Sequence, residues 1–291
     1  MTMRCVIFCF SGTGNTLKVV DEYRTHLEER GVEVAVRKVT NRLDNFGIDD
    51  FDLVGIAYPI HGFNAPEPII DMVKQLPASE KKYFVVKTSG EMLKLNNISS
   101  NKMAKILKKK GYSQVGEYHY AMPYNMIFRH TDNMASLMFD TAKSLVPLHV
   151  EEILSCNGQK LDKVFLGSFI AWLFRIEHKF MPINGKHFKT NDSCVHCGLC
   201  ERVCPKGNIH LDDGKVQFGN KCVGCMACAF ACPKNAINTA VLNGWKVNGK
   251  YDFSATPKMQ EGNHENYCKR SYVRYFENAK KVKAEGNKGN K

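Results

Sequence analysis

Two copies of one four-cysteine pattern constrain this 291-residue chain more than any other feature. The first copy reads Cys194-x2-Cys197-x2-Cys200-x3-Cys204-Pro205, and the second reads Cys222-x2-Cys225-x2-Cys228-x3-Cys232-Pro233. Because the two copies have identical spacing, the segment is an internal duplication. Three cysteines at intervals of three let one tight loop supply three corners of a cubic iron–sulfur cluster, and the proline turns the chain away after the fourth. The pattern predicts two [4Fe–4S] clusters.

The fourth cysteine of each run decides how the ligands divide between the clusters. In a duplicated run of this kind it ligates the cluster of the other run. We therefore predict that one cluster takes Cys194, Cys197, Cys200 and Cys232, and the other takes Cys222, Cys225, Cys228 and Cys204. Structural zinc also uses Cys-x2-Cys pairs, but zinc does not explain three evenly spaced cysteines before Cys-Pro, twice. Residues 190–240 resemble bacterial two-cluster ferredoxins, and residues 208–218 predict a small β-hairpin within them.

Cysteine usage and hydropathy bear on the cellular compartment. Twelve cysteines would also suit a secreted disulfide scaffold. The N-terminus, however, has no small-residue cleavage site after a long apolar stretch, so we interpret it as a first β-strand. The longest uncharged apolar run, Val164–Phe174, is eleven residues, too short for a transmembrane segment. We expect a cytoplasmic protein, and we interpret this run as a helix between domains, with a membrane-surface or partner contact as the alternative.

The formal net charge of +12 would ordinarily suggest nucleic-acid binding. Two oxidised clusters with their thiolates would lower the charge to about +8, and a flavin phosphate would lower it to about +6. Several lysines also lie in the last dozen residues, which we expect to form a frayed, solvated tail. We therefore predict no nucleic-acid partner, and the sequence leaves the oligomeric state open.

The N-terminal half begins with an apolar strand that leads directly into a loop and then a helix, Leu17–Arg30. The loop consists of small and hydroxyl-bearing residues, namely Ser11, Gly12, Thr13, Gly14, Asn15 and Thr16. Backbone N–H groups and the positive end of a helix converge in such a loop and bind anions. It contains no lysine, so it is neither a Walker A loop nor a dinucleotide loop. A phosphate monoester would be held by neutral donors; the alternative is a purely structural turn.

The following sequence alternates strand and helix patterns. Candidate strands are Glu33–Val39, Leu53–Tyr58, Tyr83–Thr88 and Val115–Tyr120, and candidate helices are Glu67–Leu76, Ile98–Lys110 and Asp132–Leu154, the last interrupted near Pro147. Five strands joined by helices predict an α/β fold with a doubly wound parallel sheet. Ligands bind such sheets where the strand order reverses, at the carboxyl ends. Three loops should therefore meet: the first loop, Tyr58-Pro59-Ile60-His61-Gly62-Phe63-Asn64, and Thr88-Ser89-Gly90-Glu91.

These loops carry a resemblance to flavodoxins. Ser11–Thr16 is similar to the loop with which that family binds the FMN phosphate. The resemblance implies that the second loop places an aromatic ring, Tyr58 or Phe63, against the flavin, and that the third contacts the ring edge. Tyr58 as plain core and His61 as a loop hydrogen-bonding residue are the alternatives. No side chain stands out as a catalytic acid, base or nucleophile.

The whole chain resembles a family of anaerobe proteins that fuse a flavodoxin-like domain to a two-cluster ferredoxin, the EFR1-type ferredoxins. Residues 57–66 and 122–125 add to the motifs above, and the resemblance covers about residues 1–240. We predict an FMN-binding domain at 1–155, a helical linker at 156–189, a small α+β ferredoxin domain at 190–240 and a C-terminal extension at 241–291. Its aromatic part, up to about residue 276, should wrap back on the core, and its basic end should be disordered.

The resemblance implies electron transfer between FMN and the two clusters, with exchange of electrons with partner redox proteins. The basic charge predicts an acidic partner, of ferredoxin or flavodoxin type. Two alternatives remain open at this point. One is an FMN-dependent reductase of a small molecule, fed by its own ferredoxin domain. The other is a redox sensor that keeps the fold without a flavin.

Overall fold

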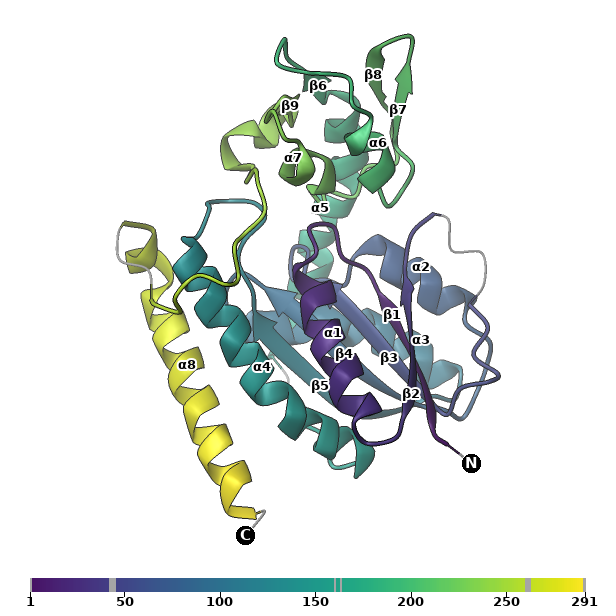
Figure 1. Cartoon of the computed structure of the whole chain (residues 1–291). Helices are drawn as coiled ribbons and strands as arrows, with labels where there is room; N and C mark the ends of the chain where they lie inside the picture. Colours follow the sequence, from purple (N-terminus) through teal and green to yellow (C-terminus); the bar gives the residue numbers. More distant parts are fainter. Residues whose placement is uncertain (1, 42–45, 160, 163, 260–262, 290–291) are drawn as a thin grey trace.

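A five-stranded parallel sheet forms the centre of the larger lobe in this computed structural model, which describes residues 2–41, 46–159, 161–162, 164–259 and 263–289 (Figure 1). The strand order is β2-β1-β3-β4-β5 and every neighbouring pair is parallel. The strands are β1 (Arg4–Cys9), β2 (Glu33–Lys38), β3 (Leu53–Pro59), β4 (Lys82–Ser89) and β5 (Ser113–Ala121). This is the flavodoxin-like doubly wound order, and it places the topological switch point between β1 and β3.

Helices cover both faces of the sheet because the strands are apolar on both sides. In β1 the side chains alternate: Cys5, Ile7 and Cys9 join one buried cluster, and their neighbours join the other. The first face packs against α1 (Asn15–Glu28) and α4 (Asp132–Leu154). The second face packs against α2 (Glu67–Gln75) and α3 (Asn101–Lys109), which follows the 3-10 helix η1 (Lys94–Ser100). The predicted doubly wound architecture is confirmed.

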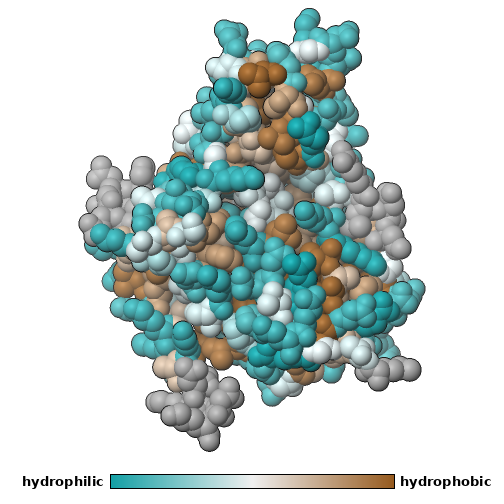
Figure 2. Space-filling view, viewed as in Figure 1, coloured by the Kyte–Doolittle hydropathy of each residue, from teal (hydrophilic) through white to brown (hydrophobic). Residues whose placement is uncertain are grey.

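A smaller lobe stands over the carboxyl edge of this sheet, and the two are in contact in the space-filling view (Figures 1 and 2). It contains the cysteine duplication. Its elements are β6 (Lys189–Thr190), α6 (Leu199–Val203), β7 (Ile209–Asp212), β8 (Lys215–Phe218), α7 (Ala227–Ala231), β9 (Ile237–Asn238) and the 3-10 helix η2 (Ala240–Trp245). Strands β7 and β8 pair antiparallel around Asp213 and Gly214, so the predicted hairpin is confirmed.

The two cysteine loops repeat the same backbone conformation. His196 and Gly198 have positive φ in the first loop, and Gly224 and Met226 have positive φ at the equivalent places in the second. Left-handed residues at these two places reverse the chain twice within a few residues, which lets one short loop turn several groups toward a common centre. The internal duplication is therefore structural as well as sequential.

Three long helices depart from the sequence prediction. Helix α4 continues through Pro147 without a break. Within the predicted linker, only Gly167–Lys186 forms the helix α5, which reaches from the sheet toward the smaller lobe. Helix α8 (Asn263–Gly289) lies beside α4 and extends through the stretch expected to be a disordered basic tail. Apolar burial continues into this stretch, since Val282 packs against the buried cluster that includes Leu145 and Val146 of α4.

Candidate functional site

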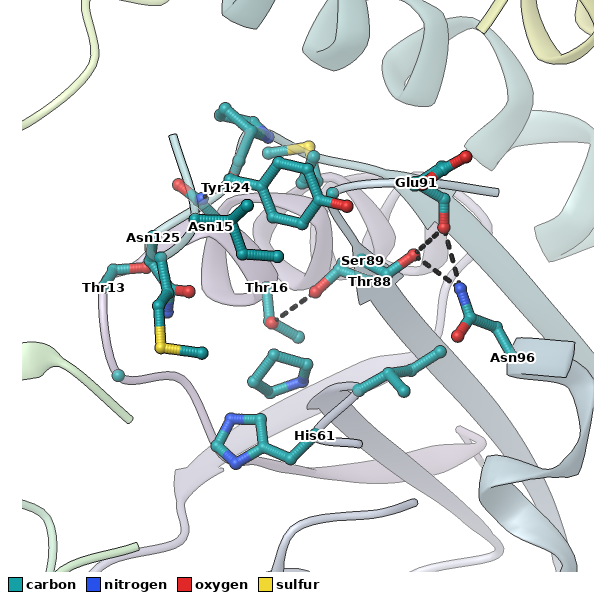
Figure 3. Close-up of a pocket in the computed structure, with 18 of the residues that line it drawn as sticks. Thr13, Asn15, Thr16, His61, Thr88, Ser89, Glu91, Asn96, Tyr124 and Asn125 are labelled. Atoms are coloured by element: carbon teal, nitrogen blue, oxygen red, sulfur yellow. Dashed lines mark hydrogen bonds between the residues drawn. The ribbon is translucent and has the colours of Figure 1, made fainter. Parts of the chain in front are cut away.

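A cavity of about 410 Å³ lies at the carboxyl edge of the sheet, where the predicted loops meet (Figure 3). All three loops contribute to its wall, together with a fourth loop after β5, one residue of α5 and one residue of a cysteine loop. The predicted residues that line it are Ser11, Gly12, Thr13, Asn15, Thr16, Pro59, Ile60, His61, Gly62, Phe63, Thr88, Ser89, Gly90 and Glu91. The strand order therefore assembles the four loops of this site from residues up to 116 apart along the chain, from Ser11 to Ile127.

The first loop wraps the N-terminus of α1 and presents only neutral groups. The Ser11 hydroxyl accepts a weak hydrogen bond, 3.4 Å long, from the Leu17 N–H. The hydroxyls of Thr16 and Thr88 lie 2.8 Å apart and join this loop to β4. Gly14 has φ of 93° and begins the helix. Among the described residues, the lining contains no lysine or arginine, so an anion here would rely on hydroxyls, backbone N–H groups and the helix dipole.

The third loop is held by a network behind the cavity wall. The Ser89 hydroxyl donates to the Glu91 carbonyl at 2.6 Å and lies 2.7 Å from His119 Nε2. The Asn96 amide also donates to the Glu91 carbonyl, at 2.7 Å. Burial, followed by the nearby charge of Lys87, lowers the pKa of His119, so this ring is neutral. Burial also raises the pKa of Glu91. These bonds fix the loop against the end of β4.

A fourth loop, residues 122–127 after β5, forms a wall that the sequence prediction did not include. Its aromatic residue is Tyr124, whose ring packs directly on Gly90: a Cβ on Gly90 would lie 2.2 Å from Tyr124 Cδ1. Tyr124 and His61 lie on opposite sides of the cavity (Figure 3). The signal was present in the sequence, because β5 ends at the same sheet edge as its neighbours. Leu93, Asn96, Phe174 and Gly224 also line the cavity and were not predicted.

Helix α8 supports this fourth loop from behind. The Tyr272 hydroxyl donates to the Gly90 carbonyl at 2.7 Å and lies 2.9 Å from His130 Nε2. His130 Nδ1 in turn accepts from the Tyr124 N–H at 3.2 Å, and the two rings stack. The C-terminal extension therefore contacts the cavity loops in two ways. Tyr272 binds Gly90 directly, and it reaches Tyr124 through His130.

Three residues of the predicted site do not line the cavity. Tyr58 is fully buried in the sheet core on the α2 and α3 side. Asn64 points away from the cavity and donates to the Ala171 carbonyl on α5 at 3.0 Å. Gly14 is part of the loop but not of the wall. Tyr58 is thus a core residue, which corrects its assignment as a candidate ring contact and leaves Phe63.

His61 does line the cavity, and burial lowers its pKa to about 4, so it is neutral at pH 7.

The eight cysteines of the duplication line two further cavities in the smaller lobe. Each cavity receives three cysteines from one run and the fourth from the other run. The inner cavity, which faces the sheet, is lined by Cys222, Cys225, Cys228 and Cys204; the outer cavity is lined by Cys194, Cys197, Cys200 and Cys232. Among the described residues, no group of three or more His, Cys, Asp or Glu is spaced to hold a single metal ion. Four thiols around one cavity are the arrangement that a four-cornered cluster needs.

Backbone N–H groups point at several of these sulfurs. The Asn208 N–H donates to Cys204 Sγ at 3.2 Å, and the Ala236 N–H donates to the equivalent Cys232 Sγ at 3.3 Å. Burial raises the pKa of the Cys225 thiol to about 12. Metal ligands must be deprotonated, so binding of a cluster here would release the protons of these thiols. The donors would stabilise the charge that a thiolate-bound cluster brings.

The inner cysteine cavity and the large cavity share a wall. Gly224, between Cys222 and Cys225, lines the large cavity itself. Gly12 packs so closely on the cysteine loop that an added Cβ would lie 2.5 Å from the Cys225 carbonyl oxygen. The Asn125 amide donates to the same carbonyl at 3.4 Å. The anion-binding loop thus contacts the backbone of a cysteine that lines the inner cavity.

Known proteins match the two lobes separately. The family described as 4Fe-4S binding domain matches residues 188–210 and 219–238, once for each run, so the chain carries a duplicated 4Fe–4S domain. No curated protein matches the chain.

Solved flavodoxins are similar to the larger lobe. One from Streptococcus pneumoniae is 16% identical, with a TM-score of 0.40, and the match covers 52% of this chain and 98% of the flavodoxin. One from Fusobacterium nucleatum, bound to flavin mononucleotide, is 16% identical, with a TM-score of 0.38, covering 53% of this chain and 98% of that one. The assignment of the fold rests on the strand order and not on these scores.

Proposed function

We propose that this protein transfers electrons between an FMN bound in the large cavity and two [4Fe–4S] clusters in the smaller lobe, and exchanges them with partner redox proteins. The observation that carries this proposal is the shared wall: Gly224 lines the large cavity, and Gly12 contacts the Cys225 backbone. Electron transfer needs closely spaced centres, and carrying both kinds of centre on one chain removes the step in which two proteins must first meet. The proposal extends to membership of the fusion family named above and to a cytoplasmic, anaerobic setting.

The cluster ligands follow from the two cysteine cavities. Cys222, Cys225, Cys228 and Cys204 would hold the inner cluster, and Cys194, Cys197, Cys200 and Cys232 would hold the outer one. The crossing of the two fourth cysteines is supported by the cavity in which each lies. The matching 4Fe–4S family and the N–H donors to sulfur support the cluster chemistry.

The large cavity suits FMN for three reasons. Its first loop offers neutral donors at a helix N-terminus, which suit a phosphate monoester. Gly90 lets the Tyr124 ring pack directly on the third loop, where a Cβ would clash, so the ring stays at the cavity wall. Phe63 and Tyr124 supply aromatic surface from two different loops. A bound FMN would supply one-electron and two-electron chemistry. The chain itself would hold the phosphate at residues 11–16 and position the ring with the loops at 60–63, 88–91 and 122–127.

The structure suggests an order for the centres. The inner cysteine cavity contacts the loops of the large cavity, whereas Cys197 of the outer group is exposed to solvent. A partner would therefore meet the outer cluster first. The basic charge of the chain favours an acidic partner, and the association should weaken as salt rises.

The test is an anaerobic redox titration followed by UV–visible and EPR spectroscopy, with iron and flavin quantified on the same sample. We expect about eight irons, from two four-iron clusters, and about one FMN per chain. Eight irons with no flavin, even after incubation with FMN, would overturn the flavin half of the proposal. Fewer than about four irons after anaerobic reconstitution would overturn the cluster half.

The second candidate is an FMN-dependent reductase, and the titratable lining favours it. Glu91 lines the cavity, and burial raises the pKa of its carboxyl group, which suits a proton donor to a bound molecule. Steady turnover of a small-molecule acceptor without a partner protein would favour this candidate. Turnover that requires a second redox protein would favour the electron carrier.

A further inference from the structure

Helix α5 is apolar on two opposite faces, and only one of them is covered by the protein. On the inner face Ala171 and Met181 are buried, and Gly185 packs against Cys222. The opposite face carries an outer stripe of large apolar side chains spaced three or four residues apart. The outer stripe consists of Phe169, Trp172, Ile176, Phe180 and Ile183.

The outer stripe is strongly exposed. Trp172 is 58% exposed, Ile176 is 66% exposed and Ile183 is 60% exposed. Singly exposed apolar residues are ordinary, but a contiguous patch of this size on a helix marks an interaction surface. At 3.6 residues per turn these side chains fall on one line along the helix. None of the described helices is long and apolar enough to cross a membrane.

The charges around the stripe select the partner. The charged residues of α5 are Arg175, Glu177, Lys179 and Lys186, three cations against one anion. Lys179 and Lys186 are exposed and follow one edge of the stripe. Lys102 of α3 lies close to Arg175: partial burial, followed by the charge of Arg175, lowers the pKa of Lys102.

This charge distribution decides between two possible partners. A second copy of the chain would bring one net positive charge against another, since the formal +12 stays positive after cofactor binding, and this opposes association. An anionic surface, by contrast, would attract the positively charged edge of α5. Aromatic and aliphatic side chains on one face, with lysines along the edge whose stems reach past the apolar layer, are the features of a helix that lies in a membrane interface.

We propose that α5 docks the protein on anionic membranes, with the outer stripe in the headgroup–acyl boundary and Lys179 and Lys186 against the lipid phosphates. This inference does not depend on the flavin, because it uses the face of α5 opposite to the cavity. Phe174 lines the cavity on one side of the same helix, so membrane docking would place the redox centres a short distance from the lipid surface.

The two tryptophans of the chain provide a matched pair of reporters. Trp172 lies in the outer stripe, and Trp245 lies in η2 with nearly the same exposure, 57%. The full-length, cluster-loaded protein is mixed anaerobically with vesicles of phosphatidylglycerol and phosphatidylcholine, or of phosphatidylcholine alone. In Trp245→Phe, which retains Trp172, we expect a blue-shifted emission with the anionic vesicles and a shift that shrinks as salt rises. In Trp172→Phe, which retains Trp245, we expect no shift.

Substitutions on the stripe test the contact itself. Phe169→Ser/Trp172→Ser/Ile176→Ser should weaken co-sedimentation with anionic vesicles at least about tenfold, because it removes three inserted side chains. Trp245→Ser should leave it unchanged. Lys179→Glu should also weaken binding, and Lys280→Glu, an exposed lysine on α8, is the control of equal charge change. Iron content and absorbance, equal to those of the wild type, verify that each variant is folded.

Two results would overturn the proposal. One is the absence of binding to any vesicle, or equal binding by the triple serine variant. The other is a blue shift of Trp172 that depends on protein concentration and not on lipid, accompanied by a dimer in sedimentation velocity. That result would assign the stripe to contact between copies of the chain.

Discussion

At the residue scale, the cysteines and the small residues between them carry the redox chemistry of this protein. Identical spacing makes the two runs interchangeable in sequence, but each fourth cysteine lies with the three cysteines of the other run. Glycines matter where loops of different lobes touch, as Gly12 does at the Cys225 backbone. Three predictions can be made from side chains and their direct contacts.

The crossed ligand sets can be tested with paired substitutions. Cys204→Ser with Cys222→Ser removes two proposed ligands of the inner cluster and should leave about four irons per chain. Cys204→Ser with Cys194→Ser removes one ligand from each cluster and should reduce iron far more, although both residues belong to one run. Iron analysis and EPR of the dithionite-reduced protein measure the outcome. The reverse pattern would show that each run ligates its own cluster.

Gly12→Ala tests the contact between the two lobes. The new Cβ would lie 2.5 Å from the Cys225 carbonyl oxygen, so the loop or the lobe must shift. We expect a loss of about 1–3 kcal/mol in unfolding free energy or in FMN affinity, as is typical of overpacking. Gly244→Ala is the control, because a Cβ there meets nothing within 4 Å. Equal FMN dissociation constants and equal urea midpoints for both variants would contradict the contact.

His149 predicts a pH dependence of stability. It is buried beside Tyr118, and burial lowers its pKa to about 3. The unfolded chain, with a histidine pKa of about 6.5, binds more protons between these values, so stability rises with pH across the window. Above about 6.5 both states are neutral and the effect ends.

The comparison for His149 is His149→Phe, which keeps an aromatic ring in the same place. The slope of unfolding free energy against pH, from urea titrations between about pH 5 and 7, should fall by up to about 1.4 kcal/mol per pH unit. The variant also lacks the 2.5 Å hydrogen bond between the Tyr120 hydroxyl and His149 Nδ1. Its unfolding free energy should therefore be lower than that of the wild type at every pH. If the unfolding free energies of the wild type and the variant changed with pH in parallel, a titratable group other than His149 would control the loss of stability in acid.

At the element scale, α8 extends the larger lobe and supports the cavity. It packs on α4 through apolar residues, and its Tyr272 reaches the Gly90 carbonyl in the third loop. A sequence rich in lysine and asparagine predicted a frayed end here. The helix forms because Cys268, Tyr272 and Phe276 recur at four-residue spacing and bury one face against α4.

Tyr272→Phe tests this support. It removes one hydrogen bond to a loop that we propose contacts the flavin, so FMN affinity should fall by about 0.5–1.5 kcal/mol. Tyr112→Phe is the matched control, because the Tyr112 hydroxyl also donates to a backbone carbonyl, that of Pro77 at 2.8 Å, at the opposite end of the sheet. Both variants should lose unfolding free energy, Tyr272→Phe the more because its hydroxyl also lies 2.9 Å from His130 Nε2, and only Tyr272→Phe should weaken FMN binding in a fluorescence titration. Equal FMN affinities would separate α8 from the site.

At the scale of the whole molecule, the two lobes make a linear arrangement of centres. The large cavity lies at the sheet edge, the inner cysteine cavity lies against it, and the outer cavity lies beyond, with Cys197 exposed. The smaller lobe covers the carboxyl edge of the sheet, so a partner that approaches from this end meets the cysteine cavities first (Figure 1).

This order predicts which steps depend on the outer cluster. In Cys194→Ser, reduction of the flavin by an acidic ferredoxin should slow at least about tenfold, since the first acceptor is lost and the distance to the next is longer. Photochemical reduction of the flavin should still deliver electrons to the inner cluster. Stopped-flow absorbance measures both processes. An unchanged rate with ferredoxin would mean that the partner reaches the flavin directly.

The sequence by itself determined the cluster type, the eight cysteines, the parallel sheet and three of the four loops at its edge. Each of these follows from local spacing or from strand and helix periodicity. The tertiary structure alone decided that Tyr58 is core and Tyr124 lines the cavity, because burial depends on which face of the sheet a neighbouring helix covers. It also decided that Gly12 contacts Cys225 and that α5 leaves one apolar face exposed. Contacts between segments 200 residues apart in the chain have no local signature, so only the folded arrangement reveals them.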